Sequence, residues 1–224
     1  RDGLVVRIGL VKSILLCHNT RTTLNTPKGP CMRVLTFALQ KGGVAKTTTT
    51  LAVGSELGRA GQRVLIVDID GQKGNLTAAT GVQHATVAYS MTDVFRAPGD
   101  GIRRAIISTA YGFDLAPATP SLAAVEGELV DVIARELLLQ DALGDVRNDY
   151  DVVLIDTGPH LGVLTLNGLG AADTIIVPLQ AHPLALQSLP QLEQNMQKMR
   201  RLNPGVALGG IVLTMAARTS ISAG

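Results

Sequence analysis

The stretch "FALQKGGVAKTTTTLAV", residues 37–53, decides the fold, because a glycine-rich loop joins an apolar run to a helical pattern. A loop of this kind turns consecutive backbone N–H groups around phosphate oxygens. The stretch departs from the pattern G-x-x-x-x-G-K-[ST] at Ala45, yet Lys46 and Thr47 stand where a phosphate-binding loop (P-loop) needs them. A second lysine, Lys41, opens the loop, where an ordinary P-loop has no fixed cation.

The residue types of this loop predict a nucleotide site that uses magnesium. Gly42 and Gly43 permit the tight turn, Lys46 would neutralise the β- and γ-phosphate oxygens, and the Thr47 hydroxyl is a natural Mg²⁺ ligand. A helix cap with a stray lysine is the alternative interpretation. The residues expected to contact the nucleotide are Gly42, Gly43, Val44, Ala45, Lys46, Thr47 and Thr48.

Acidic residues end two other apolar runs. "VLIDTGP" ends in Asp156, which is the Walker-B pattern of a carboxylate oriented toward Mg²⁺. In "VDIDGQKGN", residues 67–75, Asp70 begins a loop where a carboxylate can orient an attacking water, whereas Asp68 is expected to be structural. Gln72 and Asn75 of that loop suit either a functional role or a loop-capping role, because both amides favour turns.

The pattern of short Val/Ile/Leu runs separated by helical segments predicts an α/β fold, a mostly parallel twisted sheet with helices on both faces. Helices are expected near 46–59, in short pieces over 86–108, over 121–143 with Ser121 as N-cap, and over 184–202. The expected strands are 33–39, 63–70, 113–120, 150–159, 173–179 and 208–215. Because ligands bind beyond the carboxyl ends of parallel strands, Lys46, Asp70 and Asp156 are expected at one edge.

Composition narrows the classes of function. Of the 224 residues, 46% are hydrophobic and 17% charged, which is typical of a globular protein. Aromatic residues at 3% argue against base-stacking platforms for single strands, and a net charge of +2 means that any DNA affinity needs a local patch. Cys17 and Cys31 lie before the P-loop without metal spacing, so a reducing cytoplasm is expected, and no apolar run predicts a membrane span.

The first 31 residues differ from the rest and lack a starting Met. We expect residues 1–31 to be an extension that is poorly ordered or not native, with the P-loop domain over 32–224. A signal peptide, or an amphipathic anchor helix over 4–16, is the alternative for this segment.

Taken together, "QKGGVAKTTTTLA", "RVLIVDID", "YDVVLIDTGPHLGVLTLNGLGAAD" and "GGIVLTM" resemble the ParA-type partition ATPases of the MinD/ParA group. The resemblance implies a deviant Walker A loop whose signature lysine is Lys41, with ATP and Mg²⁺ as cofactors. It also implies a homodimer formed with ATP, non-specific DNA binding, a ParB-type centromere-binding partner and a cytoplasmic, nucleoid-associated location, with no membrane. By the same match Lys41, Lys46 and Asp70 are catalytic, and Thr47 and Asp156 hold the metal.

Several departures from that family pattern bear on these expectations. A methyl at Ala45, where the family has glycine, is expected to fit only at negative φ. The switch loop "DGQKGN" is one residue longer than the family's, and Gly158 replaces a proline. The chain stops at "RTSISAG", where the resemblance implies a further strand and helix, so the domain is expected to be truncated at its C-terminus.

Candidate DNA-binding cations are Arg218, Arg200 and Arg201, with Lys198 beside them, and those at 198–201 also suit a helix end. The competing functions are a MinD-like membrane-associated regulator, a nitrogenase-reductase-like electron carrier, and a truncated inactive paralogue. The first would need an amphipathic C-terminal helix, and the second would need cysteines at strand ends.

Overall fold

The computed structural model describes residues 32–72, 75–181, 190, 194, 196–197, 200–201 and 203–215. The N-terminal extension, Lys198, Arg218 and the chain end therefore lie outside the described residues. The expected helix over 184–202 does so for the most part, although Arg200 and Arg201 are described as helical.

The elements alternate along the chain as the apolar pattern predicts. The strands are β1 (Arg33–Phe37), β2 (Val64–Ile69), β3 (Ile107–Ser108), β4 (Asp114–Ala116), β5 (Val152–Thr157), β6 (Thr174–Gln180) and β7 (Ala207–Thr214). The α-helices are α2 (Lys46–Arg59), α3 (Leu76–Ala79), α4 (Met91–Arg96), α5 (Leu122–Glu128), α6 (Leu138–Ala142) and α7 (Val163–Gly170). Short 3₁₀ turns at His84–Thr86, Pro98–Asp100, Arg103–Ala105 and Leu143–Val146 complete the set.

The strands form one sheet in the order β3-β4-β2-β5-β1-β6-β7. Every neighbouring pair is parallel except β3 and β4, so the predicted α/β class is confirmed. The antiparallel strand β3 was missed, because two residues are too few to show a pattern. The P-loop follows β1, which lies between β5 and β6, at the centre of the sheet.

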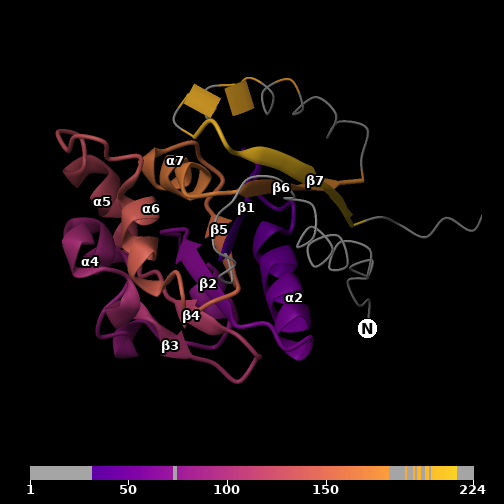
Figure 1. The fold of residues 1–224 in the computed structure, drawn as a ribbon, viewed down its shortest axis with the longest axis horizontal. Helices are drawn as coiled ribbons and strands as arrows, with labels where there is room; N and C mark the ends of the chain where they lie inside the picture. The colour runs from indigo at the N-terminus through magenta and orange to yellow at the C-terminus, as the bar shows by residue number, and fades with distance from the viewer. Residues whose placement is uncertain are drawn as a thin grey trace, which may run out of the picture.

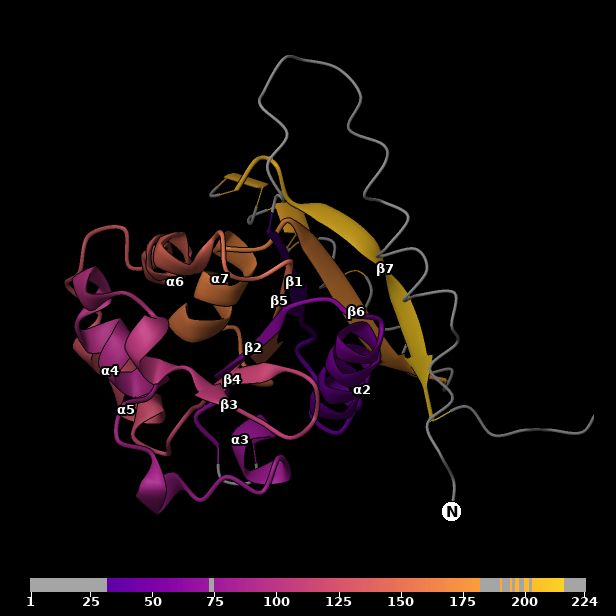
Figure 2. The ribbon, with the colours of Figure 1, turned by 60° about the horizontal axis from the view of Figure 1, so that its bottom comes forward.

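Helices cover both faces of this sheet (Figures 1 and 2). On one face α2 places Val53 and Leu57 against Phe37, Ile66 and Leu154 of three central strands. On the other face α4 to α7 pack over the alternate residues of the same strands. Since successive strand residues point to opposite faces, the continuous apolar runs are buried on both sides, which fixes β2 and β5 in the middle of the molecule.

The predicted single helix over 121–143 is wrong. The segment forms the separate helices α5 and α6, and Ala134 between them has a φ of 56°. The Asn167 side chain of α7 explains the break, because it accepts a hydrogen bond from the Leu139 N–H and donates one to the Arg135 carbonyl. Ser121 stands at the N-cap position of α5, as predicted, but its side chain makes no capping hydrogen bond and its backbone angles are helical.

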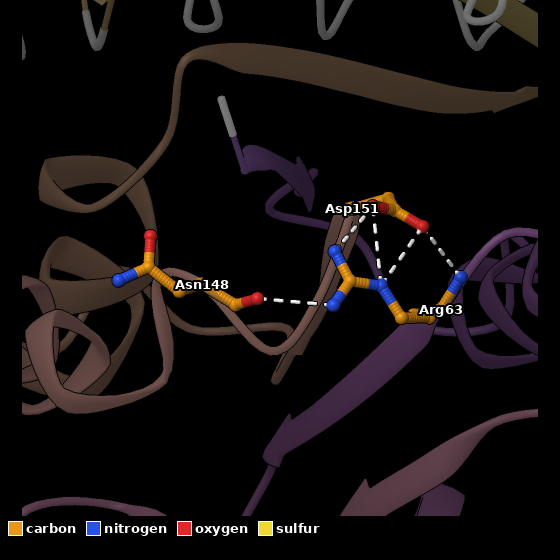
Figure 3. A network of polar contacts seen from close by, with 3 residues as sticks. All are labelled: Arg63, Asn148 and Asp151. Atoms are coloured by element: carbon orange, nitrogen blue, oxygen red, sulfur yellow. Dashed lines mark hydrogen bonds and ion pairs between the residues drawn. The ribbon is translucent and has the colours of Figure 1, made fainter. Parts of the chain in front are cut away.

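The amino ends of β2 and β5 are joined by an ion pair (Figure 3). The Arg63 guanidinium contacts the Asp151 carboxylate with its closest N···O distance at 2.7 Å, and also donates to the Asn148 carbonyl. The Arg63 N–H donates to the same carboxylate at 2.9 Å. This Arg63–Asp151 pair ties the two strands together at the edge opposite the P-loop.

Candidate functional site

Three adjacent central strands bring the predicted site residues to one edge of the sheet, which we call the carboxyl edge. The P-loop (residues 40–47) follows β1, Asp70 follows β2 directly, and Asp156 is the penultimate residue of β5. In the sheet β5 lies between β1 and β2, and Asp156 pairs with Phe37 on one side and Asp68 on the other. Lys46, Asp70 and Asp156 interact electrostatically, so the structure brings them together as expected.

The P-loop backbone contains two left-handed residues. Gly43 has a φ of 70° and Ala45, which precedes the first residue of α2, has a φ of 63°. The expectation that Ala45 requires a negative φ is therefore wrong: the loop keeps the glycine-type conformation and carries the methyl group in it. A non-glycine residue is held there only when its surroundings enforce it.

The Lys46 side chain lies folded inside its own loop. Its Nζ donates to the carbonyls of Leu39, at 3.3 Å, and Lys41, at 3.2 Å, and the residue is only 8% exposed. Burial lowers the pKa of the Lys46 ammonium, while the Asp156 and Asp70 carboxylates act in the opposite direction. This cation is thus placed and partly desolvated beside the turn where a phosphate would lie.

Asp156 joins β5 to the first turn of α2. The Thr47 hydroxyl donates to its Oδ2 at 2.6 Å, and the Thr50 hydroxyl approaches its Oδ1 at 3.4 Å. Burial raises the pKa of Asp156 to about 8, and the neighbouring Asp68 adds to the shift. Thr50 was missed, although its spacing of three from Thr47 on a helix was a usable signal.

Asp68 is the buried neighbour of Asp156 on β2. Its carboxyl accepts hydrogen bonds from the Thr77 N–H at 2.8 Å, the Thr77 hydroxyl at 2.6 Å and the Asp70 N–H at 3.0 Å. Burial raises the pKa of Asp68 to about 7, against the effect of these hydrogen bonds. The side chain thus fixes the start of the switch loop, as a structural residue would.

Asp70 lies half-buried between two loops. Its Oδ1 accepts the Gln72 N–H at 3.0 Å, and the Asn75 side-chain amide donates to its backbone carbonyl at 2.8 Å. A Cβ added at Gly158 would stand 3.2 Å from Asp70 Oδ1, so the carboxyl group rests against the loop after β5. Asn75 also caps α3, so the loop-capping interpretation holds for Asn75, while Gln72 contributes its main-chain N–H.

The switch loop approaches α5 closely at Gly71. A Cβ at this position would stand 2.6 Å from the Ala123 nitrogen near the start of α5. The loop backbone therefore passes directly over α5, and only glycine permits that approach.

The remaining predicted cations are less constrained. Lys41 is half-buried, its backbone N–H donates to the Leu39 carbonyl at 2.8 Å, and it forms no salt bridge within the described part of the chain. Arg200 and Arg201 are exposed and likewise make no ion pair with another described residue. No described contact connects these arginines with Lys46, Asp70 or Asp156, and Arg218 lies outside the described residues.

The oxygens near the loop fit a hard divalent cation. Asp156 and Thr47 supply a carboxylate and a hydroxyl, which are Mg²⁺ ligands when phosphate oxygens and water complete the octahedron. Across the described ranges there is no cluster of three His, Cys, Asp or Glu side chains that could bind a metal by itself. A cation beside Asp156 would also compensate the buried carboxylates, whose ionised forms are disfavoured without one.

Within the described part of the chain, no helix is both long enough and apolar enough to cross a membrane.

Comparison with known proteins gives a consistent family. A family model for an AAA domain, AAA_31, matches residues 32–208. The sporulation initiation inhibitor protein Soj of Bacillus subtilis is 40% identical over 191 residues, which make up 84% of this chain and 75% of Soj. The chromosome partitioning protein ParA of Caulobacter vibrioides is 40% identical over 190 residues, 84% of this chain and 71% of ParA.

A solved structure shares both fold and sequence with the chain. The cobyrinic acid a,c-diamide synthase from Mycobacterium smegmatis, with bound ADP and magnesium, superposes with a TM-score of 0.74 and is 41% identical. The match covers 80% of this chain and 72% of that one.

Proposed function

The chain belongs to the ParA/Soj-type P-loop ATPases, and on that premise we propose that it binds ATP with Mg²⁺ at the carboxyl edge and hydrolyses it. One observation carries the proposal: the Thr47 hydroxyl contacts Asp156 at 2.6 Å, and Lys46 lies folded inside the loop that joins β1 to α2. Two separate sequence motifs, the P-loop with Lys46 and Thr47 and the end of β5 with Asp156, thus place a lysine, a hydroxyl and a carboxylate beside one another. The bound ADP and magnesium of the structural neighbour support the same choice of ligand.

Different residues would bind the phosphates and the magnesium ion. Lys46 would exchange its bonds to the Leu39 and Lys41 carbonyls for bonds to phosphate oxygens, which are stronger because both partners are charged. The N–H groups of residues 42–48 would surround the phosphates at the start of α2. Thr47 and Asp156 would hold the magnesium ion, which would supply charge neutralisation for the transferred phosphoryl group.

Asp70 would act on the attacking water. Its carboxylate lies beside Gly158, accepts a hydrogen bond from the Gln72 N–H, and has no described hydrogen bond to the P-loop. A carboxylate in that place can orient water or accept its proton without contributing to ground-state binding of the phosphates.

Lys41 would act on a second subunit. Lys46 already serves the phosphates from within, and Lys41 forms no salt bridge with other described residues. When two subunits face each other across their carboxyl edges, Lys41 of each can reach the phosphates bound by the other. Its ammonium would then stabilise the transferred phosphoryl group as an arginine finger does, typically by about 10³–10⁵ in rate. Dimerisation would thereby depend on the triphosphate.

The dimer would bind DNA without sequence preference and take part in plasmid or chromosome segregation with a ParB-type partner, in the cytoplasm on the nucleoid. Exposed Arg200 and Arg201, together with Arg218, are the proposed phosphate contacts. Filter retention of unrelated duplexes over a salt series tests this, because contacts to phosphates predict equal affinities that fall linearly on a log–log plot. Strong preference for one duplex would contradict it.

A second candidate follows from the structural neighbour, which is a cobyrinic acid a,c-diamide synthase. That function would use ATP bound at the same carboxyl edge for an amide-forming reaction. ATP turnover that requires cobyrinic acid and an ammonia donor would favour it, whereas turnover that rises with DNA and a partition partner would favour the first proposal.

The experiment that tests the proposed switch compares the parent chain with Lys41→Ala. We expect the variant to bind ATP within a few-fold of the parent, yet to stay monomeric and to lose hydrolysis and DNA retention. Light scattering with and without ATP–Mg²⁺ measures the mass, and a nucleotide titration measures the affinity.

Arg147→Ala is the matched control, because Arg147 is an exposed cation near the amino end of β5, away from the P-loop. If Lys41→Ala dimerises with ATP as the parent does, the proposed role of Lys41 is wrong. A parent that binds ATP but never dimerises or turns it over would identify an inactive paralogue, and ATP-dependent capture by anionic vesicles would favour a MinD-like regulator.

A further inference from the structure

The conformation of Ala45 needs a cause outside the P-loop. Its φ of 63° is one that L-residues other than glycine avoid, because the methyl group crowds the backbone. Such a conformation persists where surrounding contacts over-determine it. The structure contains contacts of this kind on both peptide groups that flank Ala45.

On its C-terminal side, Ala45 is fixed by its own helix. The Ala45 carbonyl accepts the Thr49 N–H at 2.9 Å and the Thr49 hydroxyl at 2.6 Å. These bonds belong to the first turn of α2 and would form at any helix start with a threonine in this place. They do not explain the preceding peptide group.

On its N-terminal side, Ala45 is fixed by a residue 170 positions away in the sequence. The Thr214 hydroxyl, at the end of β7, donates to the Val44 carbonyl at 3.1 Å in a buried contact. Thr214 and Val44 are each only 1% exposed, so water cannot replace this bond. The direction of the Val44 carbonyl is therefore set by β7, which is the outermost strand of the sheet, next to β6 (Figure 2).

The position of Thr214 is itself well defined. Thr214 pairs with Gln180 in the β6–β7 ladder, and its backbone carbonyl accepts the Ala181 N–H at 2.9 Å. β6 is in turn paired with β1, the strand that leads into the P-loop. The hydroxyl thus approaches the loop from a frame that is continuous with the loop's own strand.

Because a trans peptide is planar, its carbonyl and its N–H point in opposite directions. A hydrogen bond that holds the Val44 carbonyl toward β7 therefore directs the Ala45 N–H away from β7. We propose that Thr214 is a positioning residue for the nucleotide site: its bond to Val44 holds the Val44–Ala45 peptide so that the Ala45 N–H serves phosphate. This inference rests on the proposed ATP site and names a residue that acts on it without touching the nucleotide.

The test is a titration of ATP–Mg²⁺ into Thr214→Val, in which a methyl group replaces the hydroxyl and leaves a buried carbonyl unpaired. We expect roughly tenfold weaker ATP binding, because the unpaired carbonyl disfavours the peptide orientation in which the Ala45 N–H serves phosphate. Thr214→Ser keeps the hydroxyl and should return the affinity to within a few-fold of the parent. Ala45→Gly added to Thr214→Val should also recover most of the loss, because glycine adopts positive φ without strain.

The matched control is Thr36→Val. Thr36 is a fully buried threonine of β1 whose hydroxyl donates to the Gly168 carbonyl of α7 at 2.5 Å, outside the P-loop. This variant should lower the melting temperature while keeping the parent's ATP affinity, which separates loss of packing from loss of loop geometry.

Parent-like ATP binding by folded Thr214→Val overturns the inference and leaves the proposed function intact, whereas a parent that binds no ATP overturns both. If Thr214→Val alone does not fold, restoration of folding and binding by Ala45→Gly supports the inference, and failure of that second change to restore them contradicts it.

Discussion

The two ends of the strands β2 and β5 differ in whether their charged side chains form ion pairs. At the amino ends, Arg63 and Asp151 pair at the surface with several good hydrogen bonds, so each charge has a partner. At the carboxyl ends of the same strands, Asp68 and Asp156 lie side by side, fully buried, with pKa values raised to about 7 and about 8. Lys46 is near them but bonds to loop carbonyls.

This difference indicates that the amino ends of the strands have a structural role and that the carboxyl edge has a functional one. The Arg63–Asp151 pair joins two strands and gains nothing from a further ion. The carboxyl edge instead gathers carboxyl groups whose ionised forms have too few compensating charges in the chain alone. Several titratable groups with shifted pKa values in one place are typical of functional sites. A magnesium ion with a triphosphate would supply the missing positive charge and accept the lysine.

The largest effect that would sharpen this comparison is expected from Asp70→Ala. Hydrolysis should fall by about 10²–10⁴, the usual contribution of a positioned acid or base, with little change in ATP affinity or dimerisation. Phosphate release and a nucleotide titration measure the two quantities. The exposed Asp131, in the segment between α5 and α6, provides the control variant Asp131→Ala.

Equal losses of binding and turnover in Asp70→Ala would make Asp70 a metal or folding residue instead. An unchanged rate of hydrolysis would remove it from the reaction altogether.

A second prediction concerns pH and stability. Since the folded pKa of Asp68 is raised to about 7, the folded state binds a proton that the unfolded state releases near its ordinary pKa of 3.8. This group therefore stabilises the fold least above pH 7, and its contribution falls as pH rises from about 4 to 7, by at most about 1.4 kcal/mol per pH unit.

Asp68→Asn should remove this slope, so its free energy of unfolding relative to the parent should increase from pH 5 to pH 8. Denaturant unfolding of both proteins at several pH values measures it. A difference that does not change with pH would show that Asp68 does not titrate in this range.

The smallest effect is expected at the amino edge. Arg63→Gln should lower the melting temperature by no more than a few degrees, because exposed ion pairs contribute little and the Arg63 N–H keeps its bond to Asp151. ATP affinity should be unchanged. Weakened ATP binding in this variant, measured by titration, would contradict the claim that the amino edge has no role in nucleotide binding.

The parts of the molecule that the sequence predicted are those set by local patterns. Strand, glycine-rich loop and helix follow one another at the P-loop, and an acid closes the apolar run of β5, so the meeting of Lys46, Thr47 and Asp156 follows from parallel strands alone. Asp68 was likewise recognised as structural.

The parts that failed depend on distant residues. The break between α5 and α6 is fixed by Asn167 of α7, whose amide replaces helical hydrogen bonds near Leu139 and Arg135. The positive φ of Ala45 is accompanied by the bond from Thr214 to the adjacent carbonyl. Neither contact leaves a local signature in the sequence, because each partner reads as an ordinary residue of its own element.

The central claim is that the carboxyl edge, and not the amino edge, holds ATP, and it is tested most directly by titrating ATP–Mg²⁺ into the parent, Lys46→Ala and Arg63→Gln side by side. The account predicts that Lys46→Ala abolishes measurable binding, since the phosphates lose their buried counter-charge, and that Arg63→Gln binds as the parent does. Parent-like affinity in folded Lys46→Ala would contradict the account, because the loop around residues 40–47 would then not be the phosphate site.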